Sequence, residues 1–399
     1  MPISQSRRAF LGQATVFSAS AWIATNHTRG AQSSKRWRAA IIGATGQGDY
    51  GHGLDQAFNG LAHVEVVALA DPNEAGRAQA AARANAQRPY AEYQELLTRE
   101  HPQLVVVAPR WSEKHFEVAA AALRIGAHVL TEKPFTVTLA EADKLLALAK
   151  AGGVRIAVAH QMRLAPCVVH LQRALADGLI GELVQFRAWG KQDARAGGED
   201  LIVLGTHIFD MMRLLAGDAV SCSAQVFAQG RPITRADAHP ATEKIGPIAG
   251  DEVEAHFLFA NGVTGSFTSR GRLRETLGPW GIEVLGSKGT VRILMDIDPV
   301  VLHHRGGEAK LITGKVDEWA PLAGDPSLTL TAAADQRGFG PANRRVVLDW
   351  LGAIEEQREP RCSGANAAKA LEFVMATYQA ALEQKTVALP LQKREHPLA

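Results

Sequence analysis

The chain has 399 residues, too many for one ordinary hydrophobic core, and this length predicts two domains. Hydrophobic residues make up 46% of the chain and charged residues 21%, as in soluble globular proteins. The 43 lysines and arginines nearly balance the 41 acids and form no basic block, and no apolar run reaches the ~20 residues of a membrane-spanning helix, so we expect neither a nucleic-acid partner nor a membrane span.

The first predicted segment is an export signal. Ser6 to Leu11 reads S-R-R-A-F-L, which is similar to the twin-arginine export motif, and a weakly apolar run follows from Leu11 to Ala24. The segment 1–35 carries basic residues and no acid. We therefore expect residues 1–35 to be a twin-arginine signal or a disordered basic tail, and the mature protein to be exported to the periplasm.

Residues 36–159 alternate between strand and helix patterns. Helical patterns, such as Ser112–Ile125 and Leu139–Ala151, separate short apolar runs. Such continuous apolar strands between helices predict a doubly wound parallel sheet, so we assign 36–159 to a Rossmann dinucleotide-binding domain. The predicted strands are Arg38–Ile42, Val64–Ala70, Leu104–Ala108, His128–Thr131 and Val154–Ala159.

A glycine-rich turn, Gly43 to Gly48, follows the first strand and precedes a helical pattern. Glycines there let backbone N–H groups reach a pyrophosphate at a helix N-terminus. Asp71, at the end of the second strand, can accept hydrogen bonds from the ribose of NAD and would repel a 2′-phosphate, although Arg77 nearby leaves NADP open as the less favoured cofactor. The alternative is a plain turn with a helix-capping aspartate. The predicted cofactor contacts are Gly43, Thr45, Gly46, Gln47, Gly48 and Asp71.

The spacing of this turn departs from G-x-G-x-x-G, because Thr45 and Gly46 change its register. The following run, Asp49 to Gly53, indicates an unusual phosphate loop or a substrate contact.

Glu132-Lys133-Pro134 directly follows the strand His128–Thr131, which places it at the carboxyl edge of the sheet, where ligands bind in such folds. A lysine beside a positive nicotinamide would have a lowered pKa and could transfer protons. A cis peptide bond before Pro134 would fix the direction of Lys133. On its own, E-K-P fits a surface lysine before a turn equally well.

The pattern changes after residue 160, where strands follow one another from Ser221 to Leu311. Asn261-Gly262 and Gly286 to Gly289 predict turns between strands. We predict a substrate and oligomerisation domain at 160–342, of the α+β class on an open, mostly antiparallel sheet, and C-terminal helices at 343–399 that pack back on the core. The predicted strands are Leu183–Trp189, Glu252–Phe259, Thr264–Arg270, Gly281–Leu285 and Thr290–Leu294, and the predicted helices are Pro166–Asp177, Leu201–Leu215, Asn343–Gln357 and Ala365–Glu383.

The glycine turn, Asp71, E-K-P and the β-rich second half together resemble the Gfo/Idh/MocA superfamily of dinucleotide-dependent oxidoreductases. The resemblance extends from residue 37 to about 391 and includes Arg163 and Pro166. It implies that Lys133 is catalytic and contacts both substrate and cofactor, so Glu132 and Lys133 join the predicted cofactor contacts.

The second motif of that family is an Asp four residues before a catalytic His on a helix. His207 matches the histidine, but Val203 occupies the position of the acid. The two positions share a helix face, and valine cannot orient or charge-stabilise the imidazole. Asp210 either substitutes in part or is an ordinary solvated acid.

Other polar residues are candidates for the substrate pocket. Arg163, Lys191 and Asp210 are predicted to bind substrate together with His207, although Arg163 equally fits an ion pair between domains. Glu199 and Asp200 flank the catalytic helix, and Asp200 also fits its N-cap. The cysteines Cys167, Cys222 and Cys362 and the pair His303-His304 lack the spacing of a metal site, so no metal is expected.

These residues predict an NAD(H)-dependent oxidoreductase that acts on a CH–OH group of a sugar, polyol or glycoside, with acid–base assistance from Lys133 and His207. Two alternatives remain open. One is an NAD-dependent glycoside hydrolase that works by transient oxidation and elimination, which Val203 favours. The other is a non-catalytic NAD-binding sugar sensor. The resemblance also implies a homodimer or homotetramer, because open sheet faces in that family commonly pair between subunits.

Overall fold

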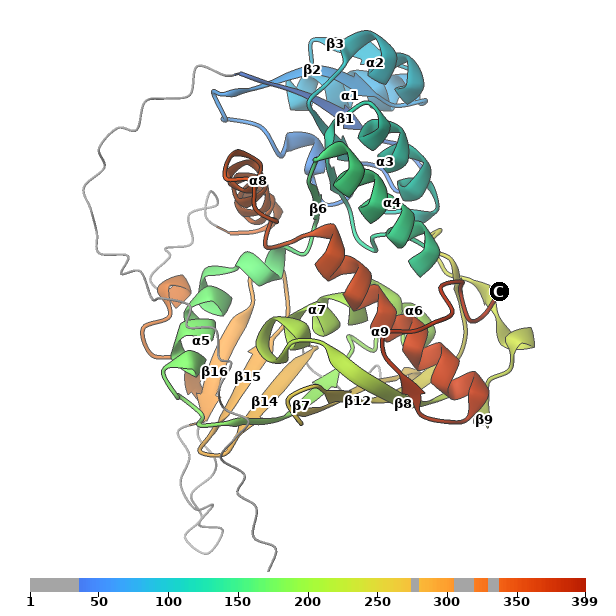
Figure 1. Cartoon of the computed structure of the whole chain (residues 1–399), viewed down its shortest axis with the longest axis vertical. Helices are drawn as coiled ribbons and strands as arrows, with labels where there is room; N and C mark the ends of the chain where they lie inside the picture. The colour runs from blue at the N-terminus through green and yellow to red at the C-terminus, as the bar shows by residue number, and fades with distance from the viewer. Residues whose placement is uncertain (1–35, 274–279, 305–318, 329–336) are drawn as a thin grey trace, which may run out of the picture. The chain divides into compact units, whose positions relative to one another are not determined.

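Two large β-sheets organise the chain, one of six strands and one of ten (Figure 1). The computed structural model describes residues 36–273, 280–304, 319–328 and 337–399, and the predicted export signal at 1–35 lies outside these ranges. Trp37–Ala399 form one compact unit. Within the described ranges, no helix has the length and apolarity needed to cross a bilayer.

The first sheet is the predicted Rossmann sheet. Its six parallel strands have the order β3-β2-β1-β4-β5-β6, which reverses between β1 and β4 and so leaves a crevice at their carboxyl ends. All four residues of β4 are buried, as expected for a strand covered on both faces. The strands are β1 Trp37–Ile42, β2 Val64–Ala70, β3 Arg88–Tyr90, β4 Leu104–Val107, β5 His128–Thr131 and β6 Ile156–Val158.

Helices from both ends of the sequence cover this sheet. Helices α1 Glu74–Ala84, α2 Tyr93–Glu100, α3 His115–Arg124 and α4 Leu139–Gly152 lie within the Rossmann segment. A C-terminal helix, α8 Phe339–Glu355, packs Trp350 and Val347 into the core cluster that contains Trp37 of β1.

The predicted helix directly after the glycine turn was wrong. Between Gly46 and Leu61 the only helical element described is the short 3-10 helix Leu54–Gln56. Four glycines and Asp49 adopt positive φ between residues 46 and 53, a conformation that a right-handed helix excludes. Helix α8 covers part of the neighbouring sheet face in its place.

The second sheet has the order β17-β16-β15-β14-β7-β13-β12-β8-β18, with β9 paired to β8. It is mostly antiparallel, as predicted, and the exception is the parallel pair β7 and β13. Asn261-Gly262 lies in the hairpin between β12 and β13, and Gly286 N donates to Gly289 O at 2.9 Å in the turn between β14 and β15. The strands are β7 Leu183–Trp189, β8 Ala219–Ala228, β9 Arg231–Pro232, β12 Glu252–Phe259, β13 Thr264–Arg270, β14 Gly281–Gly286, β15 Thr290–Leu294, β16 Val300–His304, β17 Trp319–Pro321 and β18 Val387–Ala388.

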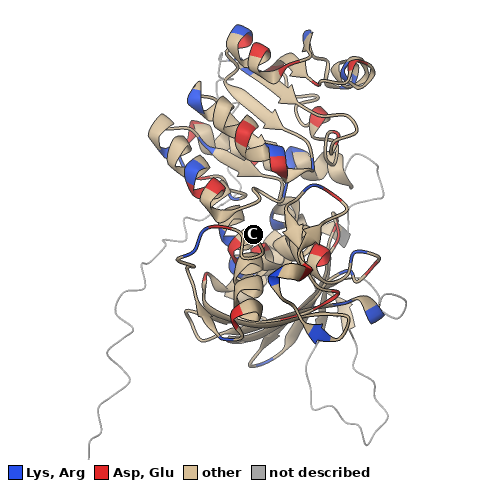
Figure 2. Cartoon of the chain, turned by 90° about the vertical axis from the view of Figure 1, so that its right-hand side faces the viewer, with Lys and Arg blue, Asp and Glu red and all other residues tan. Residues whose placement is uncertain are grey.

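Helices α5 Pro166–Ala176, α7 Gly205–Ala216 and α9 Gly364–Glu383 share one apolar core with this sheet. Its aromatic centre brings Phe209 of α7 and Phe373 of α9 within ring contact of Phe257 on β12. Basic and acidic residues are interspersed along the helices and loops, with no long run of one sign (Figure 2).

The single predicted helix Leu201–Leu215 was also wrong, because two helices occupy this stretch. Helix α6 spans Gly198–Val203 and helix α7 begins at Gly205. At the break, His207 N donates to Leu204 O at 3.0 Å, so the carbonyl of Val203 does not receive the usual helical hydrogen bond. Instead, the Val203 carbonyl accepts a hydrogen bond from the side chain of Lys133, which follows strand β5 of the Rossmann sheet.

Candidate active site

The glycine turn closes on itself around Asp71. The Asp71 Oδ2 atom accepts hydrogen bonds from Thr45 N at 3.0 Å, Thr45 Oγ1 at 2.6 Å and Tyr50 OH at 2.7 Å, and the Oδ1 atom accepts one from Asn73 N at 2.8 Å. The aspartate is fully buried. Tyr50 lies so close to Gly43 that a Cβ there would meet its ring at 2.1 Å, so the turn requires glycine.

A groove of about 280 Å³ runs past this turn at the carboxyl edge of the sheet. Gly43, Gln47 and Asp71 of the predicted cofactor set line it. Beside the groove, Gly48 approaches Trp111 N so closely that a Cβ would lie 2.7 Å away, so this position also requires glycine. A groove with a glycine wall and a carboxylate at its base fits the adenosine end of NAD. The contacts of Thr45, Gly46 and Gln47 with a pyrophosphate stay predictions.

Lys133 points from the Rossmann sheet into the second half of the chain. The peptide bond between Lys133 and Pro134 is cis, and the lysine is only 7% exposed. Its Nζ donates to the free carbonyl of Val203 at 3.2 Å. Burial lowers the pKa of Lys133, and the negative charges of Glu132 and Glu243 oppose that shift. A buried lysine with a lowered pKa is suited to proton transfer.

Glu132 anchors the turn that carries Lys133. Its Oε1 atom lies 2.9 Å from His52 Nδ1, and its Oε2 atom accepts Lys133 N at 2.9 Å. Burial would raise the pKa of Glu132, but the hydrogen bond from His52 and the nearby positive charges hold it below its usual range. The His52 ring stacks on Phe339 at 4.5 Å, and Asn343 Nδ2 donates to His52 O at 2.9 Å. Glu132 therefore holds the backbone of Lys133 in place and connects it to His52.

His207 lies close to the Lys133 side of the site. The imidazole is 7% exposed, and its Nδ1 atom is buried without a hydrogen-bond partner among the described residues. Burial holds the pKa of His207 well below its usual range, and the positive charge of Lys133 adds to this effect. A neutral imidazole is the form that accepts a proton.

Asp210 is part of a buried ion pair. Arg163 Nε donates to Asp210 Oδ2 at 2.9 Å and Arg163 Nη2 donates to Oδ1 at 2.7 Å. Burial would raise the pKa of Asp210, but the charge of Arg163 holds it well below its usual range. The alternative that Asp210 is an ordinary solvated acid was wrong, because only 2% of it is exposed. Arg163 therefore forms a buried ion pair, but both partners lie within the predicted 160–342 domain, so this is not the ion pair between domains that the sequence suggested.

Of the other predicted pocket residues, Lys191 lies in the loop before α6 and Asp200 lies within α6. Lys191 Nζ pairs with Asp193 at 3.3 Å, and its side chain is half exposed. Asp200 is not an N-cap, because it lies inside α6 and accepts Ser269 Oγ at 2.6 Å and Gln192 N at 3.1 Å. Burial raises the pKa of Asp200. These contacts shape the loop and place neither side chain against Lys133.

Three residues near Lys133 were not among the predicted contacts. The charges of Arg110, Arg195 and Glu243 all act on the pKa of Lys133. Arg110 Nε lies 3.5 Å from Glu243 Oε1. Arg110 follows the carboxyl end of β4, as Lys133 follows that of β5. Its place in the sequence could therefore have identified it as a candidate site residue. Arg195 and Glu243 come from long loops and carried no such signal.

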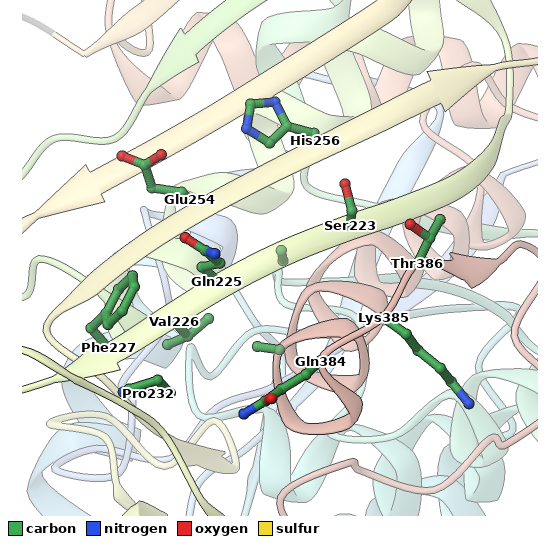
Figure 3. Close-up of a pocket in the computed structure, with 12 residues that line it drawn as sticks. Ser223, Gln225, Val226, Phe227, Pro232, Glu254, His256, Gln384, Lys385 and Thr386 are labelled. Carbon is green, nitrogen blue, oxygen red and sulfur yellow. The ribbon is translucent and has the colours of Figure 1, made fainter.

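A larger pocket, of about 680 Å³, lies away from these residues. Figure 3 shows Glu254 and His256 on β12 and Ser223 and Gln225 on β8 beside the residues that follow α9. None of the predicted cofactor or catalytic residues lines it. Size alone therefore does not mark the reaction site in this protein.

Comparison with known proteins agrees with both halves of this description. Residues 37–160 match the oxidoreductase family, NAD-binding Rossmann fold, and residues 179–389 match the C-terminal alpha/beta domain of the same oxidoreductase family. The D-apiose dehydrogenase of Paraburkholderia graminis is 30% identical over 380 residues, which cover 91% of this chain and 92% of that protein. The levoglucosan dehydrogenase of Pseudarthrobacter phenanthrenivorans is 26% identical over 255 residues, 57% of this chain and 64% of that protein.

A solved structure of levoglucosan dehydrogenase in complex with NADH and levoglucosan has the same fold. It superposes with a TM-score of 0.71 at 21% sequence identity, covering 90% of this chain and 100% of the other.

Proposed function

The chain belongs to the Gfo/Idh/MocA family of NAD-binding oxidoreductases, and from that premise we propose that it oxidises a CH–OH group of a sugar or polyol with Lys133 and His207 as its acid–base pair. The observation that carries this proposal is the approach of two buried bases from different halves of the chain, both with lowered pKa values. Uncharged at neutral pH, His207 can take the hydroxyl proton.

NAD⁺ supplies the hydride acceptor for such an oxidation. This chain supplies the groups that bind and orient the reactants. The Lys133 ammonium, held by the Val203 carbonyl, is placed to donate a hydrogen bond to a substrate oxygen, and His207 accepts the proton that leaves that oxygen. The reverse reduction uses the same two groups in the opposite order.

A sugar or polyol substrate is supported by the relatives and by the chemistry of the site. The D-apiose and levoglucosan dehydrogenases are both named for carbohydrates. Arg110, Arg195 and Glu243 supply the kinds of donor and acceptor that hold hydroxyl groups. Incubation of the purified protein with NAD⁺ and a panel of aldoses, polyols and anhydrosugars should produce NADH absorbance with at least one compound. An absence of NADH across the panel, from protein that binds NAD, would contradict the proposal.

A second candidate function is hydrolysis of a glycoside through transient oxidation by bound NAD⁺. Val203, in place of the acid of the family motif, favours it because the usual dehydrogenase pair of side chains is incomplete. The two candidates differ in stoichiometry. A dehydrogenase accumulates NADH with substrate, whereas the hydrolase releases p-nitrophenol from p-nitrophenyl glycosides with no net NADH.

We also propose that residues 1–35 direct folded protein to the periplasm by the twin-arginine route. The paired arginines Arg7 and Arg8 support this. Such a protein would carry its cofactor with it, so the mature form should copurify with NAD(H). Replacing both arginines with lysine should retain the protein in the cytoplasmic fraction, and unchanged export would contradict the proposal.

The outer face of the ten-stranded sheet is proposed as the surface of a homodimer or homotetramer. Val184 and Leu258 are apolar side chains exposed on that sheet, by 52% and 41%. Sedimentation of the mature protein should give an oligomer, and Leu258→Lys should shift it toward the monomer. A monomer at micromolar concentration would exclude this assembly.

A further inference from the structure

A second histidine, His160, contacts His207 from the end of strand β6. It is 3% exposed, and the centroids of the two imidazole rings lie 5.4 Å apart at an interplanar angle of 60°. The Nδ1 atom of His160 faces Asp210 Oδ1 at 3.6 Å. The Nε2 atom of His160 and the Nδ1 atom of His207 are both buried, and neither has a hydrogen-bond partner in the described structure.

The ionisation of Asp210 determines which ring nitrogens carry protons. An ionised carboxylate can only accept hydrogen bonds, so the His160 Nδ1 atom that faces it carries the hydrogen. In a neutral His160 the Nε2 atom is then an acceptor. The complementary partner for this acceptor is a hydrogen on Nδ1 of His207. That arrangement leaves Nε2 of His207 with a free lone pair.

We propose that His160 is a positioning residue that accepts the Nδ1 hydrogen of His207 and so presents Nε2 of His207 as the base. This inference rests on the proposed oxidation of a hydroxyl group. In that reaction NAD⁺, when bound, would accept the hydride released as the substrate C–H bond breaks. The O–H proton moves to Nε2 of His207, and the Nδ1 hydrogen stays on His207 toward His160.

This arrangement compensates for the missing acid at position 203. In the family motif an acid four residues before the histidine would hold its Nδ1 hydrogen directly. Val203 offers no side-chain acceptor, and its carbonyl is already bonded to Lys133 Nζ. Asp210 cannot turn toward His207 because Arg163 holds both of its carboxylate oxygens. His160 lies between the two and connects them. The two ring centroids lie 5.4 Å apart, and each ring carries one buried nitrogen without a partner in the described structure, so the pair has the complementary groups that this hydrogen bond needs.

The first test measures the tautomer of His207 and needs no substrate. Nitrogen-15 NMR of histidine-labelled protein, with His207→Gln to assign the resonance, should show a neutral His207 with its hydrogen on Nδ1. His160→Phe, which removes the acceptor, should move that hydrogen to Nε2. A wild-type His207 protonated on Nε2 would overturn the proposal whatever the enzyme oxidises. The correct tautomer in a protein that oxidises no sugar would leave this inference standing and remove the proposed function.

The second test is kinetic. His160→Phe should lower kcat about 10- to 10²-fold, the scale of impaired acid–base catalysis, while the Kd for NADH stays within about twofold of the wild type. His101→Phe, at an exposed histidine directly after α2 that lines neither the groove nor the larger pocket, is the matched control and should leave kcat unchanged. His160→Gln, which retains a polar acceptor, should recover part of the loss and keeps the test usable if the Phe variant does not fold. Wild-type kcat in His160→Phe would overturn the proposal.

Discussion

The two ends of the candidate site differ in how their buried polar groups are satisfied. At the glycine turn, the carboxylate of Asp71 accepts four hydrogen bonds from the chain itself. At the catalytic end, buried nitrogens of His160 and His207 have no partner among the described residues. Buried polar groups are normally paired, because an unpaired one costs about 1–3 kcal/mol.

This difference separates a preorganised end from a reactive one. The turn around Asp71 keeps its geometry without a ligand, so its backbone is ready to contact a cofactor. The histidine end retains buried nitrogens without partners on His160 and His207, the two residues that we propose act together on the substrate hydroxyl. The polar groups around Asp71 are thus paired within the chain, whereas the nitrogens of His160 and His207 remain unpaired in the described structure.

The largest effect should come from removing the lysine at the reactive end. Lys133→Ala should lower turnover by about 10²-fold or more, because it deletes a buried donor that the fold aims at the second half of the chain. Steady-state kinetics with the sugar that gives NADH would measure this. Lys150→Ala, an exposed lysine on α4, is the matched control and should behave as the wild type. Equal turnover numbers for the two variants would contradict a catalytic role for Lys133.

At the preorganised end, the largest effect should come from filling the contact between Gly43 and Tyr50. Gly43→Ala places a Cβ 2.1 Å from the Tyr50 ring, and the overpacking should cost about 1–3 kcal/mol of unfolding free energy. It should also weaken NAD binding, because the turn must shift. Chemical denaturation and calorimetric titration would measure the two effects. Gly340→Ala on α8, where no atom lies within 4 Å of the new Cβ, should be neutral or slightly stabilising.

A smaller effect should follow from removing one donor to Asp71. Tyr50→Phe deletes the buried hydrogen bond of 2.7 Å, and we expect a loss of about 1–2 kcal/mol in unfolding free energy because the other donors to Asp71 remain. Tyr93→Phe removes a similar bond to Glu117 at an exposed position and should cost less than about 1 kcal/mol. If the Tyr93 variant lost more stability than the Tyr50 variant, the carboxylate of Asp71 would not be the centre of this end.

Much of this architecture could be predicted from the sequence, because continuous apolar strands and turn residues are local signals. Lys133 was found because a motif coincided with the end of a strand. His160 directly follows β6, and the same positional argument would have found it, but no motif drew attention to it. The contact of His52 with Glu132 joins residues far apart in the chain, which no local pattern encodes. The break at Leu204 was missed because apolar spacing is continuous across α6 and α7.

The smallest predicted effect concerns pH and tests whether burial sets the charge at the reactive end. An ordinary histidine has a pKa near 6.5, and a base must be deprotonated to act. Burial and the charge of Lys133 lower the pKa of His207 well below that of an ordinary histidine, so protonation should inactivate the enzyme only at a correspondingly lower pH. The acid limb of kcat/KM for oxidation should therefore lie below that of an exposed histidine. Because His207 lies at the other end of the candidate site from the glycine turn, the Kd for NADH should stay constant across the same range. An acid limb at pH 7 or above would mean that His207 is charged in the free enzyme, and the base would then have to be sought at Lys133.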